Sequence, residues 1–176
     1  MAKSPKRKDY LKDYTQGSDG KYSYGGKTYH MACGDQERKK TTVNLVLLAL
    51  LLLASIVTSG MSDADCAIGS FYVIIPLIGE VCAYFALAWY LVKLLMEGKE
   101  IRGYIFETAN NRIPPSCIIL IFFAALGFGT SALYLIFHGT GGEALKSMLY
   151  LAIKVLNGVL AFCMKKYYNT IQWSIL

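Results

Sequence analysis

Two charged residues, Glu80 and Lys154, lie inside long apolar stretches of the sequence. A charge at membrane depth is costly to bury, so a residue of this kind is a candidate for function by default. A buried carboxylate can accept a proton or a cation, and a nearby ammonium can neutralise it. Two interpretations therefore stay open: a structural ion pair that joins two helices, or the proton site of a small transporter.

Polar and small side chains recur near both charges at one-turn spacing, which places them on one helical face. Helix packing is favoured over ligand binding for Gly127 and Ser131, because they form a small-xxx-small pattern. His138 is expected to be an interfacial cap at a helix end rather than a pH switch. The candidate residues for a polar lining are Tyr84, Ser131, Tyr134, His138, Tyr150 and Asn157. The small residues expected at helix contacts are Gly79, Ala83, Gly127 and Gly158.

Enzyme chemistry has little support in the sequence. Paired carboxylates, a Ser/His/Asp set and metal-ligand spacing do not occur at one predicted depth. The 5 cysteines include no CxxC pair and no His/Cys cluster, which argues against a zinc site or a redox pair. The sequence therefore favours a protein that is not an enzyme, and it predicts no cofactor and no metal.

Four hydrophobic segments must position the two charges. With 55% hydrophobic and 17% charged residues in 176, the composition is that of a membrane protein. A helix rises 1.5 Å per residue, so roughly 20 apolar residues cross a bilayer. Pro114 and Pro115 predict the start of the third helix, because the first turn does not need their missing N–H groups. The expected spans are 41–59, 68–96, 115–138 and 143–164. They predict an all-α membrane protein, an antiparallel bundle of four transmembrane helices, in which Glu80 and Lys154 have similar depth.

The distribution of positive charge predicts the orientation of the bundle. Ten of the 18 Lys and Arg residues lie in the first forty positions, whereas the loop 60–67 has none. Positive loops stay inside, so both termini are expected in the cytoplasm, and we expect a plasma membrane of bacterial type. Anionic lipid headgroups are the expected partner and nucleic acid is disfavoured. The residues expected to contact the lipid surface are Lys3, Lys6, Arg7, Lys8, Arg38, Lys39, Lys40, Lys165 and Lys166.

Residues 1–40 form a basic, Tyr-rich cytoplasmic region ahead of the transmembrane domain 41–165, and 166–176 form a cytoplasmic tail. Aromatic residues alternate on both sides of Gly25-Gly26, which favours a small β-hairpin of 21–24 and 27–31. Because an isolated hairpin is marginal in water, it would need a supporting surface. As a hypothesis, the segment 102–108 supplies a third strand, and the strands form a cytoplasmic cap beneath the bundle.

The sequence supports two functions from different classes. The first is a non-enzymatic subunit or interaction partner in a membrane assembly, either a homo-oligomer or bound to a partner membrane protein. The alternative is a small oligomeric channel or proton-coupled transporter that uses Glu80 and Lys154. A membrane enzyme acting on lipid or quinone is a third, weaker possibility.

Overall fold

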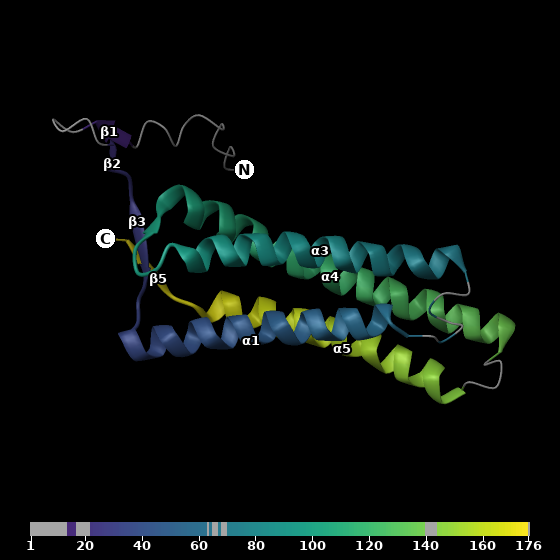
Figure 1. Cartoon of the computed structure of the whole chain (residues 1–176). Coiled ribbons are helices and arrows are strands. Elements are labelled where there is room, and N and C mark those ends of the chain that lie inside the picture. The colour runs from purple at the N-terminus through teal and green to yellow at the C-terminus, as the bar shows by residue number, and fades with distance from the viewer. Residues whose placement is uncertain are drawn as a thin grey trace.

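Four long helices lie side by side in one elongated bundle (Figure 1). The computed structural model describes residues 14–16, 22–62, 64, 67, 70–139 and 144–175. The helices are α1 (Asp35–Gly60), α3 (Phe71–Met96), α4 (Gly103–His138) and α5 (Ala144–Thr170). Each is long and apolar enough to cross a membrane. The chain is thus mostly helical, as expected of an all-α four-helix protein, and its helices are those of a multi-pass membrane protein.

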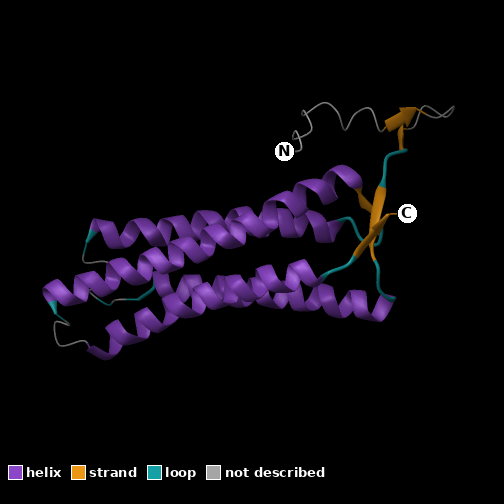
Figure 2. Ribbon diagram, turned by 180° about the vertical axis from the view of Figure 1, so that it is seen from behind, coloured by secondary structure: helices purple, strands orange, loops and turns teal. Residues whose placement is uncertain are grey.

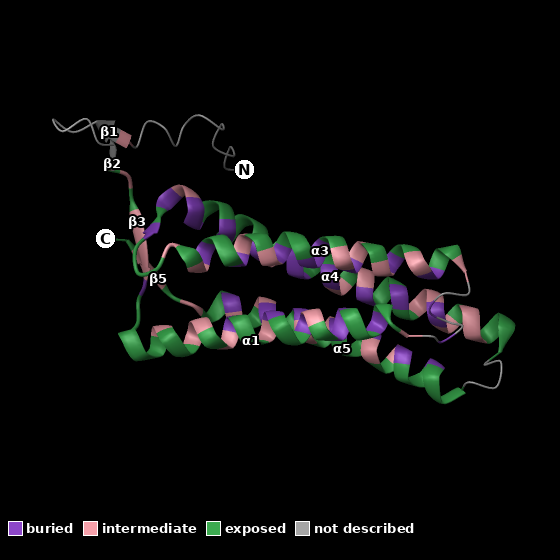
Figure 3. Ribbon diagram, viewed as in Figure 1, coloured by how far each residue is buried: buried purple, intermediate pink, exposed green. Residues whose placement is uncertain are grey.

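The order of the helices around the bundle decides which faces meet at its centre. Helix α3 packs against α4, α4 against α5, and α5 against α1, while a smaller contact between α1 and α3 closes the ring. Helices α3 and α5 therefore lie diagonally opposite one another. Large apolar side chains cover the outer surface, among them Phe85, Trp89, Phe122 and Phe162. Figure 3 shows the same division, with buried positions on the inward faces of the helices.

The prediction that the third helix starts at Pro115 is wrong. Helix α4 begins at Gly103, and Pro114 and Pro115 lie in its interior. Each proline removes one i to i−4 hydrogen bond, but Ile105, Ala109 and Ile113 form a buried apolar stripe at four-residue spacing before them. The burial of this stripe outweighs the lost bonds and extends the helix. Helix α1 also begins six residues before its expected span, and α5 ends six residues beyond its own.

A three-stranded sheet lies at one end of the bundle (Figure 2). Strand β3 (Thr28–Met31) lies in its centre, antiparallel to β4 (Ile101–Arg102) and to β5 (Trp173–Ile175). The sheet thus joins the N-terminal region, the connection between α3 and α4, and the C-terminal segment. The expected third strand at 102–108 is correct only at its first residue, because α4 starts at Gly103, and β5 was not predicted.

The expected hairpin of 21–24 and 27–31 is wrong in its pairing. Strand β2 (Tyr22–Tyr24) pairs with β1 (Tyr14–Gln16), and β3 pairs with β4 and β5. Residue 21 lies outside the described residues. The Tyr29 ring stacks on Phe106 at 4.1 Å between centroids, and Phe106 packs on Trp173 at 5.0 Å. Because this packing buries the aromatic rings, it favours the pairing of β3 with the distant strands β4 and β5. A local hairpin would leave the same rings in water.

Candidate functional site

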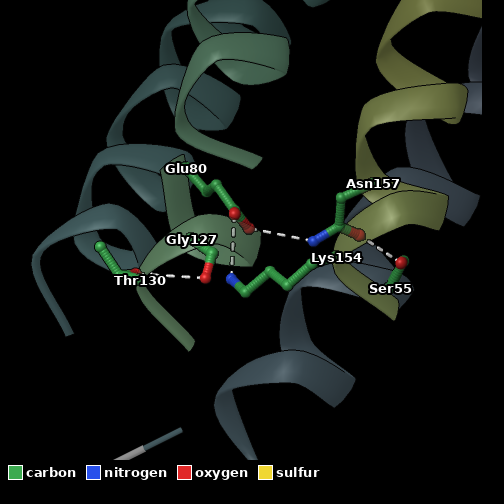
Figure 4. A network of polar contacts seen from close by, with 6 residues as sticks. All are labelled: Ser55, Glu80, Gly127, Thr130, Lys154 and Asn157. Carbon is green, nitrogen blue, oxygen red and sulfur yellow. Dashed lines mark hydrogen bonds and ion pairs between the residues drawn. The ribbon is translucent and has the colours of Figure 1, made fainter. Parts of the chain in front are cut away.

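Glu80 and Lys154 meet in the centre of the bundle (Figure 4). The Lys154 Nζ atom lies 2.9 Å from Glu80 Oε1, and both side chains have an exposed fraction of 0%. The contact is possible because α3 and α5 are diagonal, so that both residues point at the bundle axis. The question left open by the sequence, whether the two residues touch, is answered by this geometry.

Two further side chains extend the ion pair into a buried polar network of Ser55, Glu80, Lys154 and Asn157. Asn157 Nδ2 donates a hydrogen bond of 2.9 Å to Glu80 Oε2, and Ser55 Oγ donates to Asn157 Oδ1. Both carboxylate oxygens are therefore occupied by protein donors. The Lys154 ammonium also lies 5.3 Å from the centroid of the Tyr150 ring, which is a cation–π distance. The network connects α1, α3 and α5.

Helix α4 contributes a glycine to the same place. A Cβ atom at Gly127 would lie 3.4 Å from Lys154 Cε and from Pro76 Cβ, and 3.5 Å from Glu80 Oε1. A side chain larger than one methyl group would therefore displace the ion pair. All four helices thus meet at the level of the buried polar network.

The other small residues lie at contacts between helices. A Cβ atom at Gly79 would come within 2.5 Å of the Phe123 ring on α4, so α3 and α4 approach each other closely there. A Cβ atom at Gly158 would lie 3.8 Å from Ala124 on α4, and Ala83 is buried in the core.

The polar candidates divide into an inner and an outer group. Ser131 and Tyr150 are fully buried near the ion pair. Tyr84 is buried too, but its hydroxyl donates to the Ala49 carbonyl at 3.2 Å and does not join the network. Tyr134 and His138 stack on each other at 4.5 Å near the end of α4, where His138 is exposed. The structure does not bring these two rings to the ion pair.

Ser55 is the network residue with the weakest signal in the sequence. It lies in an unbroken Leu-rich stretch and has an exposed fraction of 8%. Its signal is weak, because a lone serine in a membrane helix commonly bonds to its own backbone. In the expected spans Ser55 lies four residues from the outer end and Glu80 lies twelve, so depth did not indicate their connection either.

The basic residues expected at the lipid surface lie near the sheet end as far as they are described. Lys39, Lys40 and Lys166 are exposed, and Arg38 and Lys165 are half-buried. The residues Lys3, Lys6, Arg7 and Lys8 lie outside the described part of the chain. Among the described residues, His, Cys, Asp and Glu form no group of three that could hold a metal ion.

Comparison with known proteins finds no relative of this chain. The chain matches no protein-family model, no curated protein and no solved structure.

Proposed function

We propose that this chain is a non-enzymatic subunit of a membrane assembly, in which the bundle is a stable scaffold for other chains. The observation that carries the proposal is the closed ion pair of Glu80 and Lys154. Each charge is neutralised by the other and enclosed by four helices, and Asn157 occupies the second carboxylate oxygen. An enclosed pair of this kind fixes the relative positions of helices, since any other alignment would leave a charge unpaired.

The sheet end offers the surface for a partner. Strand β5 is an edge strand, and Ile175 on it is 58% exposed. The free backbone groups of an edge strand can pair with an extended segment of another chain. We place this end in the cytoplasm of a bacterial plasma membrane, because the expected inward-facing positive charge lies on the same side.

The test is the mass of the particle after extraction from its native membrane in a mild detergent. We expect that the protein mass of the particle, after subtraction of the bound detergent, exceeds the 19.5 kDa of the monomer and corresponds to a fixed stoichiometry of chains. The substitution Ile175→Asp on the edge strand should release the partner, because it places a charge in the contact. Met96→Asp is the matched control, since Met96 is an exposed apolar residue at the end of α3 outside the sheet. A monomer in the wild-type extract would contradict the proposal.

A second candidate function is a small oligomeric channel or proton-coupled transporter. It is favoured by a carboxylate at membrane depth and by buried serine hydroxyl groups on one side of the ion pair. Purified chain in liposomes with an internal pH dye would then carry a proton flux that Glu80→Gln abolishes. Flux equal to that of protein-free liposomes would refute transport by the chain alone and leave the first proposal in place.

A further inference from the structure

The interior of the bundle differs on the two sides of the Glu80–Lys154 ion pair. Toward the sheet end, the four helices bury an apolar core that includes Leu52, Leu87, Leu120 and Met164. Toward the opposite end, the core is mixed. We call this second part of the interior the polar half, because it also buries the polar residues Ser59, Ser131, Ser147 and Tyr150.

Helical spacing places the polar side chains in line with the ion pair. Ser59 follows Ser55 by four residues on α1, and Ser131 follows Gly127 by four residues on α4. On α5, Tyr150 precedes Lys154 by four residues and Ser147 precedes it by seven. Residues at these spacings share one face of a helix. Three helices therefore carry the polar face of the interior from the ion pair toward the same end of the bundle.

Three buried hydroxyl groups in the polar half lack a partner within the described part of the chain. The exposed fractions of Ser59, Ser131 and Ser147 are 1%, 0% and 1%. None of the three Oγ atoms has a hydrogen-bond partner among the described residues. Serine and threonine in helices often bond to the carbonyl four residues earlier, as Ser116 does with Arg112. The three serines instead leave both donor and acceptor capacity inside the bundle, and a buried polar group without a partner is unfavourable.

The backbone of α3 adds an acceptor to the same half. Pro76 lies inside the helix and has no N–H group, so the Tyr72 carbonyl lacks its usual helical donor. Pro76 is also buried, one turn from Glu80 and beside Gly127. The serines and Gly127 are small, whereas the apolar half is filled by leucine and methionine side chains. The ligand that fits small, buried donors and acceptors is water, which makes about three hydrogen bonds at such sites.

We propose that the polar half holds a row of ordered water molecules, which hydrates the Glu80–Lys154 ion pair from that side alone. Water there would satisfy the serine hydroxyl groups and solvate two charges that are otherwise enclosed by apolar surroundings. Ala64 and Ala67, which lie between α1 and α3 in the sequence, are buried against Tyr150 and so cover the far end of the polar half. The inference does not depend on the proposed function, because a structural pair and a proton site both gain from hydration.

Radiolytic hydroxyl-radical labelling tests the proposal, since X-rays convert bound water into radicals that modify the side chains next to it. Two buried tyrosines form a matched pair: Tyr150 in the polar half, and Tyr84 in the apolar core, where its hydroxyl donates to the Ala49 carbonyl and needs no water. In the full chain in lipid nanodiscs, mass spectrometry should find Tyr150 modified several-fold faster than Tyr84. Equal rates, or a slower rate at Tyr150, would overturn the proposal.

A second measurement ties the water to the serines. Ser131→Ala combined with Ser147→Ala removes two hydroxyl groups with little change in volume, and it should lower the rate of labelling at Tyr150. The control is Ser116→Ala, since Ser116 lies on α4 in the apolar half and already bonds to the Arg112 carbonyl. A Tyr150 rate that is unchanged in the double variant would show that these serines do not hold the water, and would also overturn the proposal.

Discussion

Exchanging the two charges of the ion pair for neutral residues, singly and together, gives the sharpest prediction for stability. Lys154→Met would leave the Glu80 carboxylate enclosed with Asn157 as its remaining hydrogen-bond donor, and Glu80→Gln would leave the Lys154 ammonium without a counter-ion. Both side chains are 0% exposed, so bulk solvent does not screen either charge. Removing one member of a buried pair costs about 3–5 kcal/mol, whereas replacing both members can be nearly neutral.

The prediction compares the free energy of unfolding that the double variant loses with the sum of the losses in the two single variants. Independent sites would make the double variant lose about 6–10 kcal/mol, the total of the two single losses. We expect the double variant to lose less than either single variant, because it leaves no unpaired charge. The assay is reversible unfolding of the purified chain in mixed micelles, followed by circular dichroism.

Matched controls separate the ion pair from general effects of substitution. Val155→Met changes the neighbour of Lys154 on the exposed face of α5, and Glu107→Gln neutralises an exposed acid on α4. Both should leave the free energy of unfolding nearly unchanged, since surface changes rarely exceed about 0.5 kcal/mol. Additive losses in the double variant would refute the conclusion that Glu80 and Lys154 stabilise each other.

Three further predictions use the same unfolding assay. Gly79→Ala should cost about 1–3 kcal/mol, because its Cβ would overlap the Phe123 ring. Gly129→Ala should be neutral or slightly stabilising, because a Cβ there meets no described atom within 4 Å. Equal effects of the two substitutions would contradict the close contact of α3 and α4. Phe106→Ala should cost about 3–5 kcal/mol, since its ring joins the sheet to α4. The backbone amides of 28–31 should then exchange their hydrogens with water faster. Full protection of these amides in the variant would contradict this role of Phe106. Asn157→Ala should cost about 1–3 kcal/mol because one carboxylate oxygen loses its donor, and a loss no larger than that of an exposed residue would contradict the network.

The sequence was sufficient for the four helices and for the shared level of the two central charges along the bundle. Long apolar stretches fix the number of helices that can cross a membrane, and counting residues from the outer ends gave Glu80 and Lys154 a similar depth. Their contact could not be predicted, because it depends on α3 and α5 being diagonal, which is a property of the whole bundle.

The elements that were wrong or missed depend on contacts between distant segments. Prolines favour a first turn and therefore predict that α4 starts at Pro115, but the buried face of Ile105, Ala109 and Ile113 continues the helix to Gly103. Strand β5 has no strong local signal, and it forms because β3 offers an edge and Phe106 contacts Trp173. Aromatic alternation showed that residues 22–31 favour strands, but not which strands would pair.

The most direct test of the central claim is a measurement of the contact between Glu80 and Lys154 in a lipid bilayer. Solid-state NMR of chain labelled with 15N at lysine Nζ and 13C at glutamate Cδ reports their dipolar coupling, and Lys154→Met assigns the signal. A closed pair, with Nζ at 2.9 Å from Oε1, predicts a strong coupling that the variant loses. Absence of a coupling between the two side chains in the folded wild-type protein would contradict the claim that they hold α3 and α5 together.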